Sequence, residues 1–429
     1  MTGQSLVKDI LQFLQDARGV DLATVTSPPF FLAPVSVVEV GSCWAERPEV
    51  FAAPAHEPSA EKRALLVLKW LLLSLKRQFY AGDVAGTGNI KKPLNAFLGE
   101  LFIASWTAEH DDDGGHGRAR ATTNLVVEQI SHHPPTTALY MWDGENGISA
   151  QAFSRVKMVF NTGLGPDDAA GLGIDISQSG YGTLHIDRFD EDHLIPAPRA
   201  RVKGLLSGHL YPELVGTCHS VSSGGFVSEI RFSPPEDKSR GLFGWLDVRG
   251  SRERKNRFVA SLYHRDDPEK KPLYTAAGQW SGAFSIRDER QGEIIETYNM
   301  SETRPQPAII QKTEDMDPWE TRRAWGPVAQ ALRSGDMAEA ARQKSKLEKS
   351  QREMRSAEKR TGTEWFPIFF KKRRENDELF ERLASAVKWP LEGGADVWAA
   401  DEEKARSQKR PFRENVAPLG YSHELGSNK

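Results

Sequence analysis

The middle of the chain is a long series of short segments with the composition of β-strands. From Leu98 to about Gln291, runs of β-branched and aromatic residues alternate with breaks rich in glycine, proline and aspartate. Short strands at regular spacing, each bounded by turn signals, are typical of an antiparallel barrel or sandwich. The sequence therefore predicts a mainly β fold, with its clearest strands at 125–127, 156–160, 226–232 and 258–263.

Helical patterns flank this region on both sides. Between Glu61 and Phe79 the apolar residues lie nearly all round a helix, which indicates a helix buried by neighbours on several sides. Residues Ala329 to Arg360 are rich in Ala, Glu, Lys, Gln and Arg and lack proline, so they predict one long polar helix. From about Lys371 the sequence is charged and interrupted by helix breakers, and we expect a charged tail there.

The amino-terminal segment combines an amphipathic helix with a proline turn. Val7, Ile10 and Leu14 lie at helical spacing, and two prolines then fix an extended turn before three large apolar side chains. Two interpretations are open: a terminal helix docked on the core, or a movable lid or membrane-surface helix. The residues assigned to a lid are Leu6, Ile10, Leu14, Pro28, Pro29, Phe30, Phe31 and Leu32.

Composition excludes several classes of protein. The 56 basic and 59 acidic side chains give a net charge of -3, which provides no global field to gather nucleic acid. Two cysteines, Cys43 and Cys218, cannot build a disulfide framework. The longest apolar run, Leu65 to Leu75, is shorter than the ~20 residues that a membrane span needs. With no leader at the amino terminus, we expect a cytosolic protein.

Two adjacent histidines form the most unusual motif. His132 and His133 follow a strand pattern, and the prolines after them break the strand, so both imidazoles can turn to one side. Such a pair of N–H donors suits a phosphate monoester. A hydrogen-bonded structural pair and a general base remain alternative interpretations. We find no catalytic triad or metal motif, and the 111–116 loop is interpreted as a solvated hairpin tip.

Two further polar patterns are ambiguous on their own. Lys92, Asn95 and Glu100 could hold a charged, hydroxyl-bearing group, although a solvated loop with a surface ion pair is the ordinary interpretation. On the predicted polar helix, positions 344, 348 and 352 fall at i, i+4 and i+8, which usually stabilises an exposed helix. The residues of that ladder are Lys344, Glu348 and Arg352.

The segment from Glu128 to Pro135 resembles the signature E-Q-V-S-H-H-P-P of the oxysterol-binding protein family, with Ile130 in place of valine. Residues 92–100 resemble the second motif of that family and depart from it at Ala96, where the family usually has proline. Residues 273–282 and 344–352 also fit. The resemblance runs to about Arg360 and is strongest to short yeast-type members, in which no pleckstrin-homology domain precedes the lipid-binding unit.

This resemblance implies an α+β, mainly β fold: an incomplete antiparallel β-barrel around a hydrophobic tunnel, with an amino-terminal lid and flanking helices. The expected organisation is an amphipathic lid at 1–32, a helical subdomain at 33–97, the barrel at 98–291, and a helical subdomain with a charged tail at 292–429.

The resemblance also implies two lipid sites in the tunnel. His132, His133 and Arg352 would hold the 4-phosphate of phosphatidylinositol 4-phosphate, with the lid turn completing the site. The other expected head-group residues are Lys92, Asn95, Glu100, Lys344 and Glu348. The residues expected to surround a sterol hydroxyl, directly or through water, are Trp44, Gln78, Phe79, Ser154 and Gln178. Phe79 replaces a tyrosine of the family pattern and Ser154 replaces an asparagine.

The expected activity is lipid transfer by a monomer that binds sterol or phosphatidylinositol 4-phosphate and touches anionic membranes transiently. We expect no cofactor, no metal and no catalysis. Three alternatives are open: exchange of phosphatidylserine for phosphatidylinositol 4-phosphate, a lipid-regulated sensor, and a hydrolase with His132 or His133 as its base.

Overall fold

A single curved β-sheet dominates the computed structural model, which describes residues 3–83, 86–110, 119–162, 171–234, 255–373, 377–390, 396–413 and 416–421. The sheet has 13 strands, and each predicted strand lies within one of them. The strands are β3 (Leu101–His110), β4 (Ala119–His132), β5 (Pro135–Asp143), β6 (Ile148–Asn161), β7 (Gly173–Ile186), β8 (Glu191–Ile195), β9 (Arg199–Lys203), β10 (Tyr211–Ser222), β11 (Phe226–Phe232), β12 (Arg257–His264), β13 (Tyr274–Gln279), β14 (Ala283–Asp288) and β15 (Glu293–Asn299).

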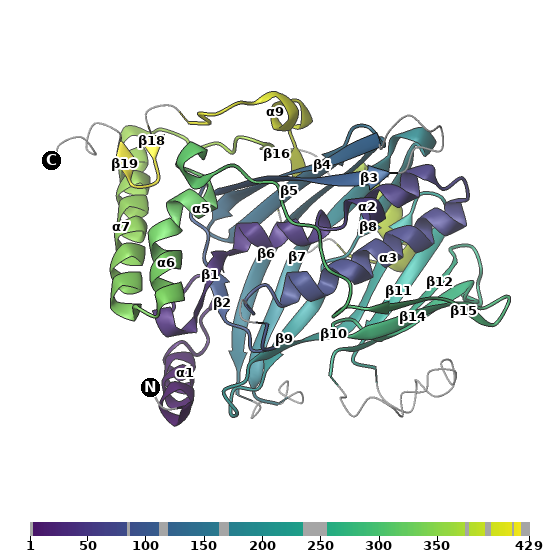
Figure 1. Cartoon of the computed structure of the whole chain (residues 1–429), viewed down its shortest axis with the longest axis horizontal. Coiled ribbons are helices and arrows are strands. Elements are labelled where there is room, and N and C mark those ends of the chain that lie inside the picture. The colour runs from purple at the N-terminus through teal and green to yellow at the C-terminus, as the bar shows by residue number, and fades with distance from the viewer. Residues whose placement is uncertain are drawn as a thin grey trace.

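The sheet curls without closing. Its strands run antiparallel in the order β15 to β10, β8, then β7 to β3, with β9 paired to both β10 and β7. The edge strand β3 is covered by a later segment, because Leu101 and Ser105 form β-bridges with Glu320 and Ile309. The sheet also continues to β15, past the barrel boundary expected at residue 291. The result is an incomplete antiparallel barrel, as predicted (Figure 1).

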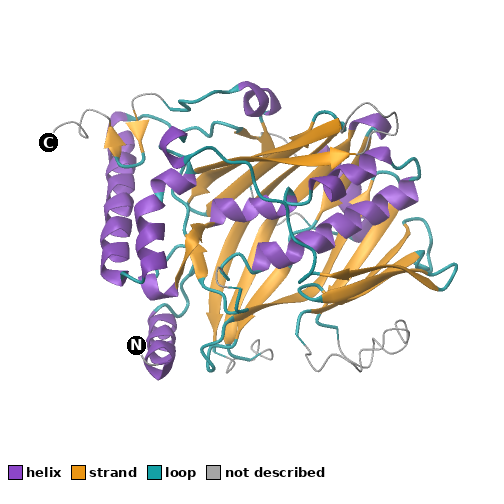
Figure 2. Cartoon of the chain, in the orientation of Figure 1, coloured by secondary structure: helices purple, strands orange, loops and turns teal. Residues whose placement is uncertain are grey.

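Helices lie across the concave side of this sheet, as Figure 2 shows. The helix α3 (Ala60–Phe79) begins at the N-cap Ser59, whose side chain accepts from the Lys62 N–H. Most of its apolar residues are buried, in agreement with the all-round pattern. Before it come the 3-10 helix η2 (Val37–Trp44) and α2 (Pro48–His56). Trp44 and Trp70 pack edge to face, with ring centroids 4.9 Å apart, and join inward residues of the sheet in the largest core cluster.

The long polar helix predicted for 329–360 is wrong in its extent, because the structure contains two helices there. They are α6 (Gly326–Ser334) and α7 (Met337–Thr361), preceded by the short α5 (Thr321–Ala324). The break is at Gly335, which has a φ of +78°, a conformation that glycine adopts without strain. Asp336 then caps α7 by accepting from the Glu339 N–H at 2.9 Å. The two helices pack beside one end of the barrel (Figure 1).

The prediction of a charged tail is wrong for the carboxy-terminal region, because this region contains helices and strands. Its elements are β16 (Phe370–Lys372), α8 (Glu378–Ala384), β17 (Trp398–Ala400), α9 (Glu402–Ser407), β18 (Val416–Ala417) and β19 (Gly420–Tyr421). Apolar side chains of this region are buried with residues on the convex face of β4 to β7. The Tyr181 hydroxyl donates to Asp377 at 2.5 Å, and Gln151 accepts from the Ala400 N–H at 2.8 Å. Burial of scattered apolar residues explains why charge alone misled the prediction.

Candidate functional site

The amino-terminal helix covers one end of the space inside the sheet. In α1 (Gly3–Asp16), Ile10 and Leu14 are buried with Phe31 against inward side chains of β6, β7 and β9. The chain after α1 is tied to β6, because Leu22 N–H donates to the Met158 carbonyl at 2.8 Å. The predicted lid residue Leu6 lies in α1, but its side chain is outside the described part of the structure. The helix is therefore placed where a lid must lie.

The proline turn connects this helix to the basic residues. Pro28 is extended, and Pro29 begins the 3-10 helix η1 (Pro29–Phe31). The next strand, β1 (Leu32–Ser36), pairs in parallel with β2 (Lys92–Leu94), and Leu32 is the register partner of Lys92. Phe30 is half-buried beside the same cluster. The sequence thus holds the turn next to a buried lysine.

Lys92 is the centre of a basic cluster beneath this turn. Its Nζ donates to Asn95 Oδ1 at 2.6 Å and to Ser27 Oγ at 3.3 Å. Burial is the main cause that lowers the Lys92 pKa to about 7, and the nearby charge of Lys344 lowers it further. Lys344 is itself buried, and its Nζ lies 2.6 Å from Glu348 Oε1. Lys344 is thus paired with a carboxylate, whereas the bonds of Lys92 go to the neutral oxygens of Asn95 and Ser27, so an anion beside Lys92 would stabilise its charged form.

The two histidines lie side by side at the end of β4. Their ring centroids are 4.7 Å apart at 67°, and both side chains are exposed. Although the His132 side chain keeps exposed surface, nearby protein atoms partly desolvate its ring, and this desolvation and the neighbouring His133 lower its pKa. The charges of Glu348 and Arg355 on α7 also act on it. A bound phosphate would reverse this shift, because its negative charge favours the protonated imidazoles. The histidine pair thus borders the same helix as the lysine cluster.

The other expected head-group residues are placed differently. Arg352 is exposed on α7, one turn beyond Glu348. Glu100 is fully buried and accepts from Trp325 Nε1 at 2.8 Å and from Phe97 N–H at 3.1 Å. Burial raises the Glu100 pKa to about 7. In the contacts of the described residues, Glu100 belongs to this buried group and not to the basic cluster.

Two residues have contacts near the histidine motif that the sequence analysis did not predict. Arg355 lies seven residues after Glu348, and its charge reaches His132, so helical spacing could have identified it. Glu128 stands four positions before His132 in the histidine motif. It accepts from the backbone N–H groups of Ile368 and Phe369 at 2.8–3.0 Å and so fastens the carboxy-terminal segment to β4. No sequence signal links positions that are so far apart.

The residues expected around a sterol divide into two groups. Trp44 lies against Gly182 on β7, near Ser154 and Gln178, which are hydrogen bonded to each other at 3.1 Å. The other two residues, Gln78 and Phe79, lie at the end of α3, where Phe79 packs against Trp280 with centroids 6.1 Å apart. Both groups belong to the concave side of the sheet.

The concave side of the sheet carries inward apolar side chains that keep solvent-accessible surface. The inward residues Val156, Met158 and Ile176 remain half-buried, although α1 and α3 cover this face. Cys218 on β10 is also half-buried, yet the protein around it raises its pKa to about 12 by desolvation. These inward side chains thus keep accessible surface on a side of the sheet whose other residues are largely apolar.

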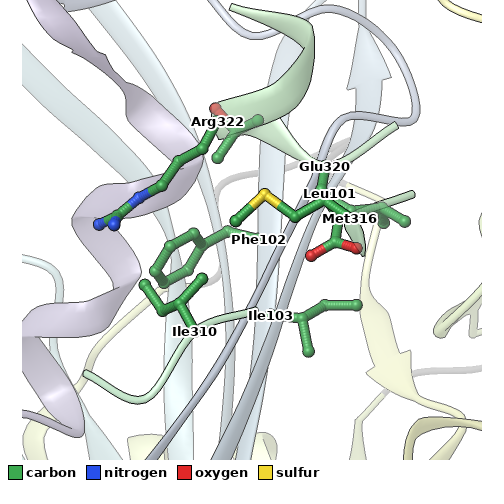
Figure 3. Close-up of a pocket in the computed structure, with 8 residues that line it drawn as sticks. Leu101, Phe102, Ile103, Ile310, Met316, Glu320 and Arg322 are labelled. Carbon is green, nitrogen blue, oxygen red and sulfur yellow. The ribbon is translucent and has the colours of Figure 1, made fainter. Parts of the chain in front are cut away.

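A small pocket on the edge strand β3 is separate from this interior (Figure 3). Its empty volume is about 150 Å³, below the roughly 300–1,000 Å³ typical of ligand sites. The guanidinium of Arg322 points away from it and binds Glu39 at 2.9 Å. The lining residues are Leu101, Phe102, Ile103, Ile310, Met316, Glu320, Thr321 and Arg322. We interpret it as a packing gap under the segment that covers β3.

In the described ranges, His, Cys, Asp and Glu side chains form no group of three or more that could hold a metal ion. The acidic loop at 111–116 lies outside those ranges. Among the helices of the described residues, none has the length and apolar character needed to cross a bilayer.

A curled, incomplete barrel with an apolar interior, a covering helix and a basic cluster beside that helix defines the class of lidded lipid-binding proteins. The family model described as oxysterol-binding protein matches residues 9–396. The chain therefore belongs to the oxysterol-binding protein family, whose members are lipid-binding and lipid-transfer proteins.

Individual relatives support this membership. The chain is 42% identical over 404 residues to the protein of Hormonema carpetanum named "Probable transporter efuK", with 93% of this chain and 53% of that protein aligned. It thus spans about half the length of that relative. It is 30% identical over 377 residues to the kes1 protein of Schizosaccharomyces pombe, covering 87% of this chain and 88% of that protein.

Two solved structures share the fold. The Osh1 ORD domain in complex with ergosterol has a TM-score of 0.61 at 18% identity, covering 92% of this chain and 86% of that chain. The Osh3 ORD of Saccharomyces cerevisiae in complex with PI(4)P has a TM-score of 0.60 at 22% identity, covering 86% and 88% respectively. The expected fold class is confirmed by these similarities.

Proposed function

We propose that this protein is a cytosolic lipid exchanger that binds sterol or phosphatidylinositol 4-phosphate in one lidded tunnel and moves them between membranes. The observation that carries this proposal is the meeting of three features at one end of the barrel. The lid residues Ile10 and Leu14 cover the apolar interior, and the turn after them leads directly to Lys92. A lipid tail inside the barrel would thus emerge beside a phosphate-binding cluster.

The two proposed cargoes need different parts of this site. A phosphoinositide would place its acyl chains in the interior and its head group among Lys92, Asn95, Lys344 and the two histidines. A sterol would need only the apolar interior and its few polar residues. In support, ergosterol is bound in the related Osh1 structure and PI(4)P in the related Osh3 structure.

Shared use of one interior would make the two lipids mutually exclusive. Burying a few hundred Å² of apolar surface at roughly 25 cal/mol/Å² stabilises a bound sterol by close to 10 kcal/mol, about what the bilayer already gives it. Sterol can then exchange in either direction, and net delivery to one membrane requires a competitor there. A phosphoinositide in that membrane supplies it, and a phosphoinositide gradient would drive sterol transport by a monomer that touches anionic membranes transiently.

A transfer assay between liposomes tests this function. We expect the His132→Ala/His133→Ala variant to lose phosphoinositide transfer while keeping sterol transfer, because both side chains are exposed and can be removed without unfolding the protein. The matched control is His264→Ala, another exposed histidine, at the end of β12.

Equal loss of both transfer activities in the double variant would contradict the proposed division of the site. Phosphatidylserine transfer without sterol transfer would favour the phosphatidylserine exchanger. Cargo binding without transfer would favour a lipid-regulated sensor, and release of a lipid product would indicate a hydrolase.

A further inference from the structure

The inner face of β6 and β7 carries very few polar side chains. Because side chains alternate along a strand, the inward positions on these strands are the even-numbered ones, which include the core residues Ala150, Leu184 and Ile186. Of the 14 residues at positions 148–160 and 174–186 with this parity, two are polar, and they are Ser154 and Gln178. The polar chemistry that these two strands offer to a cargo therefore depends on this pair.

The pair is already satisfied by the protein. Gln178 Nε2 lies 3.0 Å from the carbonyl of Pro198, which can only accept, so the amide nitrogen must face that carbonyl. The amide oxygen then faces Ser154, whose hydroxyl donates to it at 3.1 Å. Both ends of the Gln178 amide are thus occupied without a ligand.

The neighbouring strands continue this arrangement. Thr137 on β5 is the register partner of Ser154, and its hydroxyl donates to Gln129 Oε1 at 2.6 Å. Gln129 Nε2 donates in turn to the Ser131 carbonyl at 2.9 Å. We call these four side chains, Gln129, Thr137, Ser154 and Gln178, the polar belt. It crosses β4 to β7 on the inner face, and each of its amides is paired at both ends.

Hydrogen bonds within the protein remove the usual basis on which a binding site selects a ligand hydroxyl. A site built to bond a hydroxyl rejects an analogue without it, because polar groups of the site are then left buried and unpaired. The polar belt leaves no such penalty at Gln129 or Gln178. Phe79 adds none, since its ring packs on Trp280 and carries no polar atom.

From this geometry we infer, on the basis of the proposed function, that the strand wall of the tunnel, β4 to β7, does not select for a free hydroxyl on a polycyclic cargo. This wall recognises shape and apolar surface, and any direct contact with a cargo hydroxyl falls to Gln78 at the end of α3. Ser154 acts as a positioning residue for this relaxed specificity, because it satisfies the Gln178 oxygen that a cargo hydroxyl would otherwise have to satisfy.

The test compares cholesterol with cholest-5-ene, which lacks only the hydroxyl. Each of the two compounds, in phosphatidylcholine vesicles, displaces fluorescent dehydroergosterol from the full-length protein. Selectivity for cholesterol is the midpoint concentration of cholest-5-ene divided by that of cholesterol. The membrane contribution to this ratio is the same for every variant, so it cancels when variants are compared. The variants are Ser154→Ala, which frees Gln178 Oε1, and Thr137→Val, which frees Gln129 Oε1.

The matched control is Ser149→Ala, on the same strand but on the opposite face. We expect Ser154→Ala to raise the selectivity for cholesterol at least fivefold over wild type, and Ser149→Ala to leave it unchanged. If Ser154→Ala does not fold, the same result is expected of Thr137→Val. A change below fivefold in the folded variants would overturn the inference. Failure of the wild type to take up dehydroergosterol at all would instead overturn sterol carriage itself, and the inference with it.

Discussion

Under the proposed function, the buried residue Lys92 would couple phosphoinositide binding to proton uptake. Its pKa of about 7 is low because the amine is buried and lies near Lys344, while Asp21 and Glu348 act in the opposite direction. At pH 8 the amine is therefore mostly neutral. A bound phosphate would raise its pKa, since the negative charge stabilises the ammonium form.

We predict that binding of phosphatidylinositol 4-phosphate at pH 8 is accompanied by proton uptake at Lys92. The bound state holds more protons than the free state, so affinity must fall as pH rises above 7. Calorimetry in two buffers of different ionisation enthalpy measures the uptake, which should be smaller by about one proton in Lys92→Met. Equal uptake in the variant and the wild type would contradict the assignment.

The position of a single residue could be predicted only where neighbouring residues in the sequence determined it. The two histidines could be placed together from the sequence, because the prolines after them break the strand at once. Glu100 is different: its position beside Trp325 depends on a segment more than 200 residues away. Helical or strand spacing cannot reveal such a contact, so the expected proximity of Glu100 to the lysines had no local basis.

The helix α1 is the element on which cargo retention would depend under the proposed function. Leu14 is fully buried in a cluster that joins α1 to the end of the barrel, whereas Gln15 beside it is exposed. This cluster is distinct from the main core around α3. Loss of packing here should weaken lid closure more than it weakens the fold.

We predict that Leu14→Ala speeds the dissociation of bound dehydroergosterol by about tenfold or more, because a buried Leu→Ala change removes about 2–5 kcal/mol of packing. Stopped-flow fluorescence with a cyclodextrin trap measures the rate, and Gln15→Ala is the control. An unchanged rate in Leu14→Ala, with the melting temperature also unchanged, would show that α1 does not retain the cargo.

Predictions of elements succeeded where a pattern was strong and failed at boundaries. The buried helix expected from Glu61 to Phe79 is α3, and the amphipathic amino terminus is α1. The helix expected at 329–360 is divided, because Gly335 ends the first helix, and the amino-acid composition of the segment does not indicate this break. The segments after Lys371 were misjudged because their burial comes from the outer face of a sheet built much earlier in the chain.

At the scale of the whole molecule, turn signals and short strand patterns were sufficient to predict a mainly β barrel, but not its strand order. The order places β3 and β15 at the two ends of the sheet, and the edge of β3 is covered by residues 309–320. Such covering protects an edge strand from pairing with other chains. Under the proposed function, a lipid would lie on the helix-lined concave side that results.

Under the proposed function, one lidded interior holds either lipid but never both. Native mass spectrometry of the protein, incubated with vesicles that contain dehydroergosterol and phosphatidylinositol 4-phosphate in equal amounts, measures this mutual exclusion. We predict two bound species, each with one lipid, and only the sterol-bound species for the His132→Ala/His133→Ala variant. A substantial population that carries both lipids on one chain would contradict it.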